Sequence, residues 1–219
     1  MNKVLFIPHL KNEDILKQEI DSLINQVDYF FIINNSLTPL SFIDSKIVDY
    51  IPSDSLCYEQ SLNVAIRKSH ELNIPTLWAH SDLIAHDSNV IDILIEKYEE
   101  IKNDKWGVIY ACYDALCMFN PEFFYKENLW GDPWLFINYF GDNNRYRLMD
   151  LRGWKKYSVE DRTSKLVEHL GSQTIRKHPD MNRKNGLTFD LYGQLYKKIW
   201  GGLPGQETIN DPTAKGLFP

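Results

Sequence analysis

Two short segments that lie far apart in the sequence carry residue types that bind divalent cations. Asp82 ends the segment His80-Ser81-Asp82, which follows an apolar stretch. A carboxylate at the end of a strand can bind Mg2+ or Mn2+, and the cation can then bridge the oxygens of a diphosphate. His169 follows another apolar stretch, and a neutral imidazole suits Mn2+ as well as softer metals. The residue types favour a shared metal site for Asp82 and His169, although their spacing does not establish that they meet.

Each of these residues also has a purely structural explanation. Asp82 would cap the turn or helix that follows it. His80 would be a hydrogen-bonded turn residue, and His169 would be an ordinary histidine of the core or the surface. The sequence alone leaves these alternatives open.

A second group of carboxylates lies among aromatic residues. Asp132 stands in the segment Trp130-Gly131-Asp132-Pro133-Trp134, and Asp142 follows Tyr139-Phe140-Gly141. Aromatic rings beside carboxylates are typical of carbohydrate-binding surfaces, because sugar C–H faces stack on rings while hydroxyls bond to acids. Either carboxylate would serve as a general base that removes the proton of an acceptor hydroxyl. The structural alternatives are that Asp142 shapes a turn and that Asp132 caps a helix beginning at Pro133.

Basic residues are grouped at 176–178 and 183–184. On a mobile loop after His169, this group would fold over a diphosphate and exclude water, with Lys177 as a candidate contact. The alternative is a solvated basic surface, which is what most short basic runs form.

The elements that would position these residues alternate between strand and helix patterns in the first half of the chain. Strands are expected at residues 3–8, 28–33, 46–51, 76–79 and 106–112, and helices at 13–27, 58–72 and 87–101, the last with Asp87 or Ser88 as its N-cap. This order is typical of a mostly parallel sheet with helices on both faces, and ligands bind beyond the carboxyl ends of such strands. Pro8-His9, Asn34-Asn35-Ser36 and His80-Ser81-Asp82 stand at such ends and should line one rim.

The second half of the chain has a different character. Met118-Phe119-Asn120-Pro121 indicates a turn, and residues 130–152 combine aromatic with charged side chains. The tail from residue 173 to 219 is polar, with only short apolar runs, and no internal repeat or clear linker interrupts the sequence. These features predict one domain over residues 1–219 with a C-terminal tail wrapped on it.

Composition limits the classes of partner. The 219 residues carry 30 Asp and Glu against 24 Lys and Arg, and the net charge of −6 argues against nucleic acid as a partner. The three cysteines are odd in number and not at metal-ligand spacing, which favours a reducing compartment. The apolar run near the N-terminus is too short for a signal peptide, and no stretch approaches the ~18 apolar residues of a transmembrane span. We therefore expect a cytoplasmic protein, in the host cytoplasm if the source is viral.

Taken in order, several of these segments resemble the family 2-type glycosyltransferases of the GT-A fold, which include small viral and bacterial capsular enzymes. The segment ending at Asp82 stands where the family has its DxD-type metal motif, and the segment around His169 resembles the one that brings in the last metal ligand. Ser61 to Ala65 resembles the family's helix that carries an Asn near the donor, here Asn63. Met118 to Pro121, Gly131-Asp132 and Tyr139 to Asn143 resemble its acceptor-side segment, which Arg147 and Gly153 follow. Tyr196 to Glu207 resembles a C-terminal signature of some of these enzymes.

The resemblance implies an α/β chain of the GT-A fold, with a single, mostly parallel, Rossmann-like sheet flanked by helices. Residues 1–115 would bind a nucleotide-sugar, and residues 116–219 would bind the acceptor and supply the C-terminal loop. The implied reaction is an inverting transfer of a hexose or deoxyhexose from a nucleoside-diphosphate sugar, expected to be UDP-linked, to a glycan hydroxyl, with Mn2+ or Mg2+ at the diphosphate. The implied site residues are Asp82 and His169 at the metal, Asp142 and then Asp132 as the base, and Pro8, His9, Asn34, Asn63, His80, Ser81, Arg147 and Lys177 at the donor.

Two positions depart from the family pattern. His80 replaces the first Asp of the metal motif, and Asn144 replaces the second acid after Asp142. Two other functions also stay open. A sugar nucleotidyltransferase would carry a glycine-rich loop after its first strand, whereas Ile7 to Lys11 contains no glycine. A non-catalytic glycan-binding module would need neither Asp82 nor His169.

Overall fold

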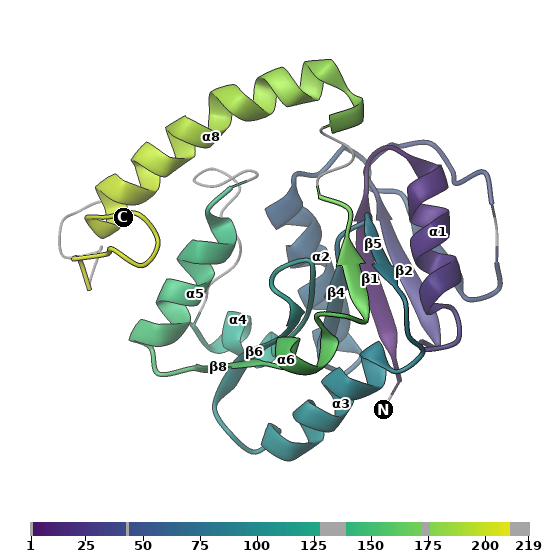
Figure 1. The fold of residues 1–219 in the computed structure, drawn as a ribbon, viewed down its shortest axis with the longest axis horizontal. Helices are drawn as coiled ribbons and strands as arrows, with labels where there is room; N and C mark the ends of the chain where they lie inside the picture. The colour runs from purple at the N-terminus through teal and green to yellow at the C-terminus, as the bar shows by residue number, and fades with distance from the viewer. Residues whose placement is uncertain (1, 43, 128–138, 172–175, 211–219) are drawn as a thin grey trace.

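The computed structural model describes residues 2–42, 44–127, 139–171 and 176–210 of the chain. Its centre is a seven-stranded sheet in the order β3-β2-β1-β4-β7-β6-β8 (Figure 1). The strands are β1 (Val4–His9), β2 (Tyr29–Asn34), β3 (Ile47–Tyr50), β4 (Thr76–Ala79), β6 (Trp106–Cys112), β7 (Leu116–Phe119) and β8 (Lys155–Ser158). Neighbouring strands run parallel except at β7, which is antiparallel to both β4 and β6. The predicted α/β class with one mostly parallel sheet is confirmed.

Helices cover both faces of the sheet because successive strand residues point to opposite sides. In β1, Leu5 and Ile7 pack in one core cluster, whereas Val4 and Phe6 pack in the other. The helices of the first cluster are α1 (Glu13–Leu23) and α3 (Val90–Ile101), and those of the second are α2 (Tyr58–Glu71), α4 (Pro121–Glu127) and α5 (Gly141–Leu151). A short helix, α6 (Glu160–Thr163), follows β8. The parallel strands β1, β2 and β4 therefore end at a common edge of the sheet.

A small second sheet carries the chain onward from this edge. It consists of β5 (Leu83–Ala85) and β9 (Val167–His169), which are antiparallel. Leu83 lies opposite His169 in the register, so the two halves of the chain meet directly after Asp82. This pairing joins the segment that follows β4 to the segment that precedes the C-terminal region.

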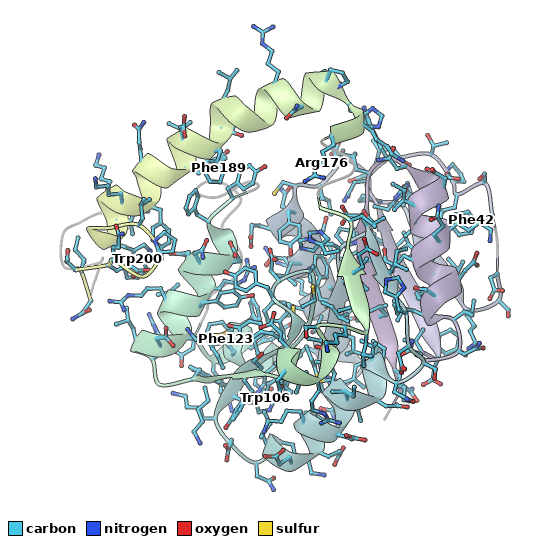
Figure 2. The ribbon with its side chains drawn as sticks, viewed as in Figure 1. Phe42, Trp106, Phe123, Arg176, Phe189 and Trp200 are labelled. Atoms are coloured by element: carbon cyan, nitrogen blue, oxygen red, sulfur yellow. The ribbon has the colours of Figure 1, made fainter. Side chains whose placement is uncertain are left out.

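The last described helix, α8 (Pro179–Trp200), lies across the end of the molecule and packs beside α5 (Figure 1). Its C-terminal half forms a separate apolar cluster of Tyr192, Tyr196, Ile199 and Trp200, against which Tyr139, Phe140 and Leu148 pack. Figure 2 shows Phe189 and Trp200 on the side of α8 that faces α5. The sequence indicated a polar tail here and did not indicate a long helix, because Gly186 and Gly193 and many polar residues hide the helical pattern.

The predicted elements of the first half are present, with ends that shift by up to four residues. α3 begins at Val90 and not after Asp87, because the Asp87 carboxylate accepts the backbone N–H of Asn89 (2.8 Å) in a turn before the helix. The turn predicted from Met118 was wrong in part: Met118 and Phe119 are buried in β7, and the chain turns only at Asn120. Among the described residues, no helix combines the length and apolar character that crossing a membrane requires.

Candidate metal and catalytic site

The candidate site begins where the chain leaves β4. This strand is fully buried between β1 and β7, so the direction of the chain at its end is fixed. His80 donates its backbone N–H to the carbonyl of Ala115 (2.9 Å), and the carbonyl of Asp82 accepts the N–H of Leu170 (2.9 Å). Backbone hydrogen bonds thus hold the turn on both sides. The side chains of His80 and Asp82 are placed by a supported segment and not by a free loop.

His80, Asp82 and His169 form a cluster in which one ligand atom from each lies within 4.8 Å of the others. His169 Nε2 is 3.0 Å from Asp82 Oδ1, and the His80 and His169 rings are 5.2 Å apart between centroids at an interplanar angle of 78°. The β5–β9 pairing brings His169 to this position. Two imidazoles and one carboxylate are a donor set that suits divalent ions of borderline softness. The sequence predicted Asp82 and His169 as metal ligands, and the structure adds His80 to the same cluster.

Burial and hydrogen bonding set the charge of the two imidazoles. Burial lowers the pKa of His80, which favours the neutral ring that a metal requires. The hydroxyl of Tyr58 lies 2.9 Å from His80 Nε2 and accepts the indole N–H of Trp78 (2.8 Å). The hydrogen bond to Asp82 raises the pKa of His169, because the carboxylate favours the protonated ring. A cation held by His169 and Asp82 would replace the proton of this hydrogen bond.

Asp142 lies at the start of α5, close to this cluster. Oδ2 of Asp142 accepts the hydroxyl hydrogen of Tyr113 (3.1 Å), and the same hydroxyl accepts a hydrogen bond from Asn143 Nδ2 (3.2 Å). Burial and the charge of Asp114 raise the pKa of Asp142 above the usual range of an aspartate. A carboxylate that is partly desolvated and aimed by a hydroxyl is suited to accept a proton. One of the two predicted bases therefore lies near enough for its charge to act on His80, whereas Asp132 lies outside the described residues.

The turn between β6 and β7 supplies two residues that sequence reasoning missed. Tyr113 has a φ of 39°, a left-handed conformation that non-glycine residues adopt with strain, and its ring is 46% exposed. Asp114 follows it, with Oδ2 at 3.7 Å from His80 Nε2. Both residues come directly after a predicted strand end. The rule that singled out the ends of β1, β2 and β4 would have found them if it had been applied to β6.

A buried ion pair fixes the base-bearing helix to α2. Arg145 on α5 pairs with Glu59 on α2, and the two side chains are only 3% and 4% exposed. The Glu59 carboxylate also lies against Gly141, where a Cβ would collide with it. Tyr58, the neighbour of Glu59, contacts His80. Two consecutive residues at the start of α2 therefore position the histidine cluster and the start of α5.

The predicted nucleoside residues Pro8, His9 and Asn34 lie at the ends of β1 and β2, as expected. His9 is buried, and burial lowers its pKa; within the described part of the chain, its Nδ1 has no hydrogen-bond partner. Asn34 is fully buried, and its amide makes four hydrogen bonds inside the protein, with Thr38, Asp49 and twice with Ser36. A nucleoside contact by Asn34 would require breaking these bonds, so its observed role is to shape the turn.

The other predicted donor residues lie in different surroundings. Ser81 lies between His80 and Asp82, and Asn63 is half-buried on α2. Arg147 donates hydrogen bonds to Ile209 (3.3 Å) and Asn210 (2.7 Å) and lies over the Trp200 ring. Arg147 therefore holds the chain that follows α8. The predicted contact of Arg147 with the donor stays a prediction.

The basic group after His169 is divided between two places. Lys177 is exposed, with Nζ at 3.8 Å from a carboxylate oxygen of Asp14 on α1. Arg176 lies between the end of β9 and the start of α8 (Figure 2), beside Gly171, and its charge acts against protonation of His169. In this group it is the charge of Arg176 that acts on His169. The sequence analysis placed the whole group over a diphosphate and named Lys177 as the candidate contact.

The C-terminal signature from Tyr196 to Glu207 forms a packed unit. Tyr196 donates its hydroxyl hydrogen to Glu207 (2.6 Å), and Trp200 Nε1 donates to Asn144 Oδ1 (2.9 Å) on α5. Gly201 ends α8 in the left-handed conformation, with φ at 76°. The signature thus holds α8 against the helix that carries Asp142.

Comparisons with known proteins give a likeness in structure only. No protein-family model matches the chain, and no curated protein matches it in sequence. A crystal structure of residues 1–349 of TarS from S. aureus superposes with a TM-score of 0.50 at 9% identity, over 74% of this chain and 58% of that one. A Drosophila beta-1,4-galactosyltransferase 7 mutant in complex with manganese, UDP-Gal and xylobiose gives a TM-score of 0.48 at 14% identity, over 81% of this chain and 74% of that one.

The chain has the GT-A fold. It spans little more than half the length of the S. aureus structure. At this level of identity the likeness concerns the arrangement of the sheet and its helices, and the activity has to be argued from the site.

Proposed function

We propose that the chain is a metal-dependent glycosyltransferase that transfers a sugar, with inversion, from a nucleoside-diphosphate sugar to a glycan hydroxyl. The observation that carries the proposal is the His80, Asp82 and His169 cluster at the carboxyl edge of the sheet, together with the Asp142 carboxylate, whose charge acts on His80. Ligands of open α/β sheets bind at this edge. UDP is the proposed nucleotide, and residues 1–115 and 116–219 are the proposed donor and acceptor halves of one domain.

His80, Asp82 and His169 would hold the cation. Because two of the three donors are imidazole nitrogens, we propose Mn2+ in preference to Mg2+, which favours oxygen ligands and retained waters. For His80 to offer Nδ1, its Nε2–H must donate to the Tyr58 hydroxyl 2.9 Å away, as metal-bound histidines commonly do to an oxygen. When bound, the cation would offset the negative charge that develops on the departing nucleoside diphosphate. Arg176 is the proposed second contact of the diphosphate.

Asp142 is the proposed base. It would accept the proton of the acceptor hydroxyl while the oxygen attacks the anomeric carbon from the side opposite the diphosphate. One base and one displacement invert the anomeric centre, and no covalent sugar–enzyme intermediate is needed. Tyr113 would keep the Asp142 carboxylate in place through its hydrogen bond. Asp132 remains the second candidate.

The proposed location is the cytoplasm, on the grounds of the cysteines. The structure describes Cys57, Cys112 and Cys117 as free thiols, which suits a reducing compartment.

A thermal-shift screen of nucleoside diphosphates and their sugars, with and without Mn2+, tests the proposal. A ligand at 100 times its Kd stabilises the folded state by about 2.7 kcal/mol, which for a chain of this size raises Tm by roughly 5–10 °C. We expect such a shift from one nucleoside diphosphate and its sugars, and only with Mn2+ present. Absence of any shift across all the nucleotides would contradict the proposal. A shift from a nucleoside triphosphate with a sugar 1-phosphate would favour a nucleotidyltransferase, and a shift from glycans alone would favour a glycan-binding module.

A further inference from the structure

We infer that Asp114 binds a hydroxyl group of the sugar that is transferred, and that the donor is therefore a sugar with a free hydroxyl on the ring edge facing the β6–β7 turn. This inference rests on the proposed function, and it deepens it by naming a residue that selects the donor sugar. The sequence leaves open whether the donor sugar is a hexose or a deoxyhexose. A contact between Asp114 and one hydroxyl would exclude a donor that lacks the hydroxyl at that ring position.

The β6–β7 turn connects the two parts of the site through consecutive residues. Tyr113 reaches the base side, with its hydroxyl 3.1 Å from Asp142 Oδ2. Asp114 lies near His80, with Oδ2 3.7 Å from Nε2. Its charge acts on His80 and His169 and also on Asp142. The hydrogen bond from the Tyr113 backbone N–H to Glu160 (2.7 Å) and the antiparallel β6–β7 pairing hold this turn in place. The β6–β7 turn therefore lies between the histidine cluster and Asp142.

In a single displacement, the position of this turn decides which part of the substrate it faces. The leaving diphosphate oxygen, the anomeric carbon, the attacking oxygen and the base must stand in this order, close to a line. If the cation at His80, Asp82 and His169 marks the leaving-group end, Asp142 marks the acceptor end. A side chain between the two faces the sugar that is transferred. Asp114 occupies that position.

The carboxylate of Asp114 is available for a ligand. Its side chain is 29% exposed, and none of the described residues donates a hydrogen bond to it, since the His80 contact at 3.7 Å is longer than a hydrogen bond. An ionised carboxylate accepts hydrogen bonds only, and sugar hydroxyls are donors that match it. Such charge-assisted bonds are stronger than those between neutral groups. A site built around one also rejects an analogue that lacks the hydroxyl, because the carboxylate is then left unpaired.

The test compares Asp114→Asn and Asp114→Ala with Asp161→Asn, which removes the same charge from an exposed position on α6. The probes are Mn2+ alone, UDP with Mn2+, and UDP-glucose, UDP-galactose and UDP-N-acetylglucosamine with Mn2+. We expect Asp114→Ala to lower kcat/KM for the best of these donors by about 10- to 100-fold, the range of one hydrogen bond to a charged group. Because the Asp114 charge acts on His80 and His169, its removal should weaken Mn2+ binding somewhat, but by far less than Asp82→Ala does, and Asp161→Asn should leave the Kd values for Mn2+ and for UDP with Mn2+ within twofold.

A second arm uses monodeoxy forms of the best donor. The unchanged protein should discriminate strongly against one of them, and Asp114→Ala should lose that discrimination. Equal discrimination in both proteins overturns the inference. A loss of Mn2+ affinity in Asp114→Asn as large as that in Asp82→Ala would make Asp114 a metal ligand, and loss of the acidic limb of the pH–rate profile would make it the base. Either result also overturns the inference. If the unchanged protein binds no UDP and no UDP-sugar with Mn2+, the proposed UDP donor fails, and the inference fails with it.

Discussion

Replacing Glu59 by Gln removes one partner of the buried pair with Arg145, which is 97% shielded from solvent. The amide keeps the shape of the side chain and removes its charge, so the buried Arg145 cation loses the carboxylate it pairs with and keeps only the weaker interaction with Asp142. Its Nε and Nη2 already have no hydrogen-bond partner among the described residues. Breaking a buried pair in this way costs about 3–5 kcal/mol, a large part of a total stability of about 5–15 kcal/mol. For a chain of this size, Tm should fall by about 6–20 °C.

Urea unfolding followed by tryptophan fluorescence measures this loss, with Asp21→Asn as the matched control. Asp21 pairs with Lys17 at the surface, where both side chains are more than half exposed, so its loss should cost less than about 0.5 kcal/mol. The double variant Glu59→Gln/Arg145→Met leaves no buried charge and should recover most of the stability. A buried ion pair is refuted if Glu59→Gln lowers the free energy of unfolding no more than Asp21→Asn does. It is also refuted if the loss in the double variant equals the sum of the losses in Glu59→Gln and Arg145→Met.

Three further predictions concern the site. Asp142→Asn should depress transfer by at least about 100-fold while donor affinity changes little, as measured by steady-state kinetics and by calorimetry; equal losses in both would move the base elsewhere. Tyr113→Phe should shift the acidic limb of the pH–rate profile to higher pH, because the tyrosine hydrogen bond lowers the pKa of Asp142 and the base acts only when ionised; an unchanged limb would contradict this. Mn2+ affinity, followed by calorimetry, should fall as pH drops through the raised pKa of His169, above 6.5, because a proton then occupies the ring nitrogen; constant affinity from pH 8 to 5.5 would exclude His169 as a ligand.

The framework of the fold follows from local patterns in the sequence. The buried runs of β1, β2, β4 and β6 are short, apolar and bounded by turn residues. Such runs predict strands, and these segments form strands in the folded protein. The amphipathic helices between them have clear apolar faces. These elements alone fix the edge of the sheet where ligands bind, which explains why residues at the ends of the strands could be singled out.

The composition of the site depends on contacts that local patterns do not contain. β5 and β9 have three residues each, and residues that lie far apart in the sequence pair in them, such as Leu83 with His169, so nothing local predicts these strands. Arg147 resembled a ligand contact because of its position after Asp142, yet it binds the chain after α8. Glu59 was expected on a helix and Arg145 in a segment of aromatic and charged residues, and only the packing of α2 against α5 turns them into a buried pair.

The measurement that tests the central claim most directly is Mn2+-dependent donor turnover by Asp82→Ala beside the unchanged protein. We expect Asp82→Ala to lose Mn2+ binding and hydrolysis or transfer of the nucleoside-diphosphate sugar, while circular dichroism shows an intact fold. His80→Ala and His169→Ala should each weaken Mn2+ binding in the same assay. If Asp82→Ala turns over the donor with Mn2+ at the rate of the unchanged protein, the cluster of His80, Asp82 and His169 is not the metal site, and the account is contradicted.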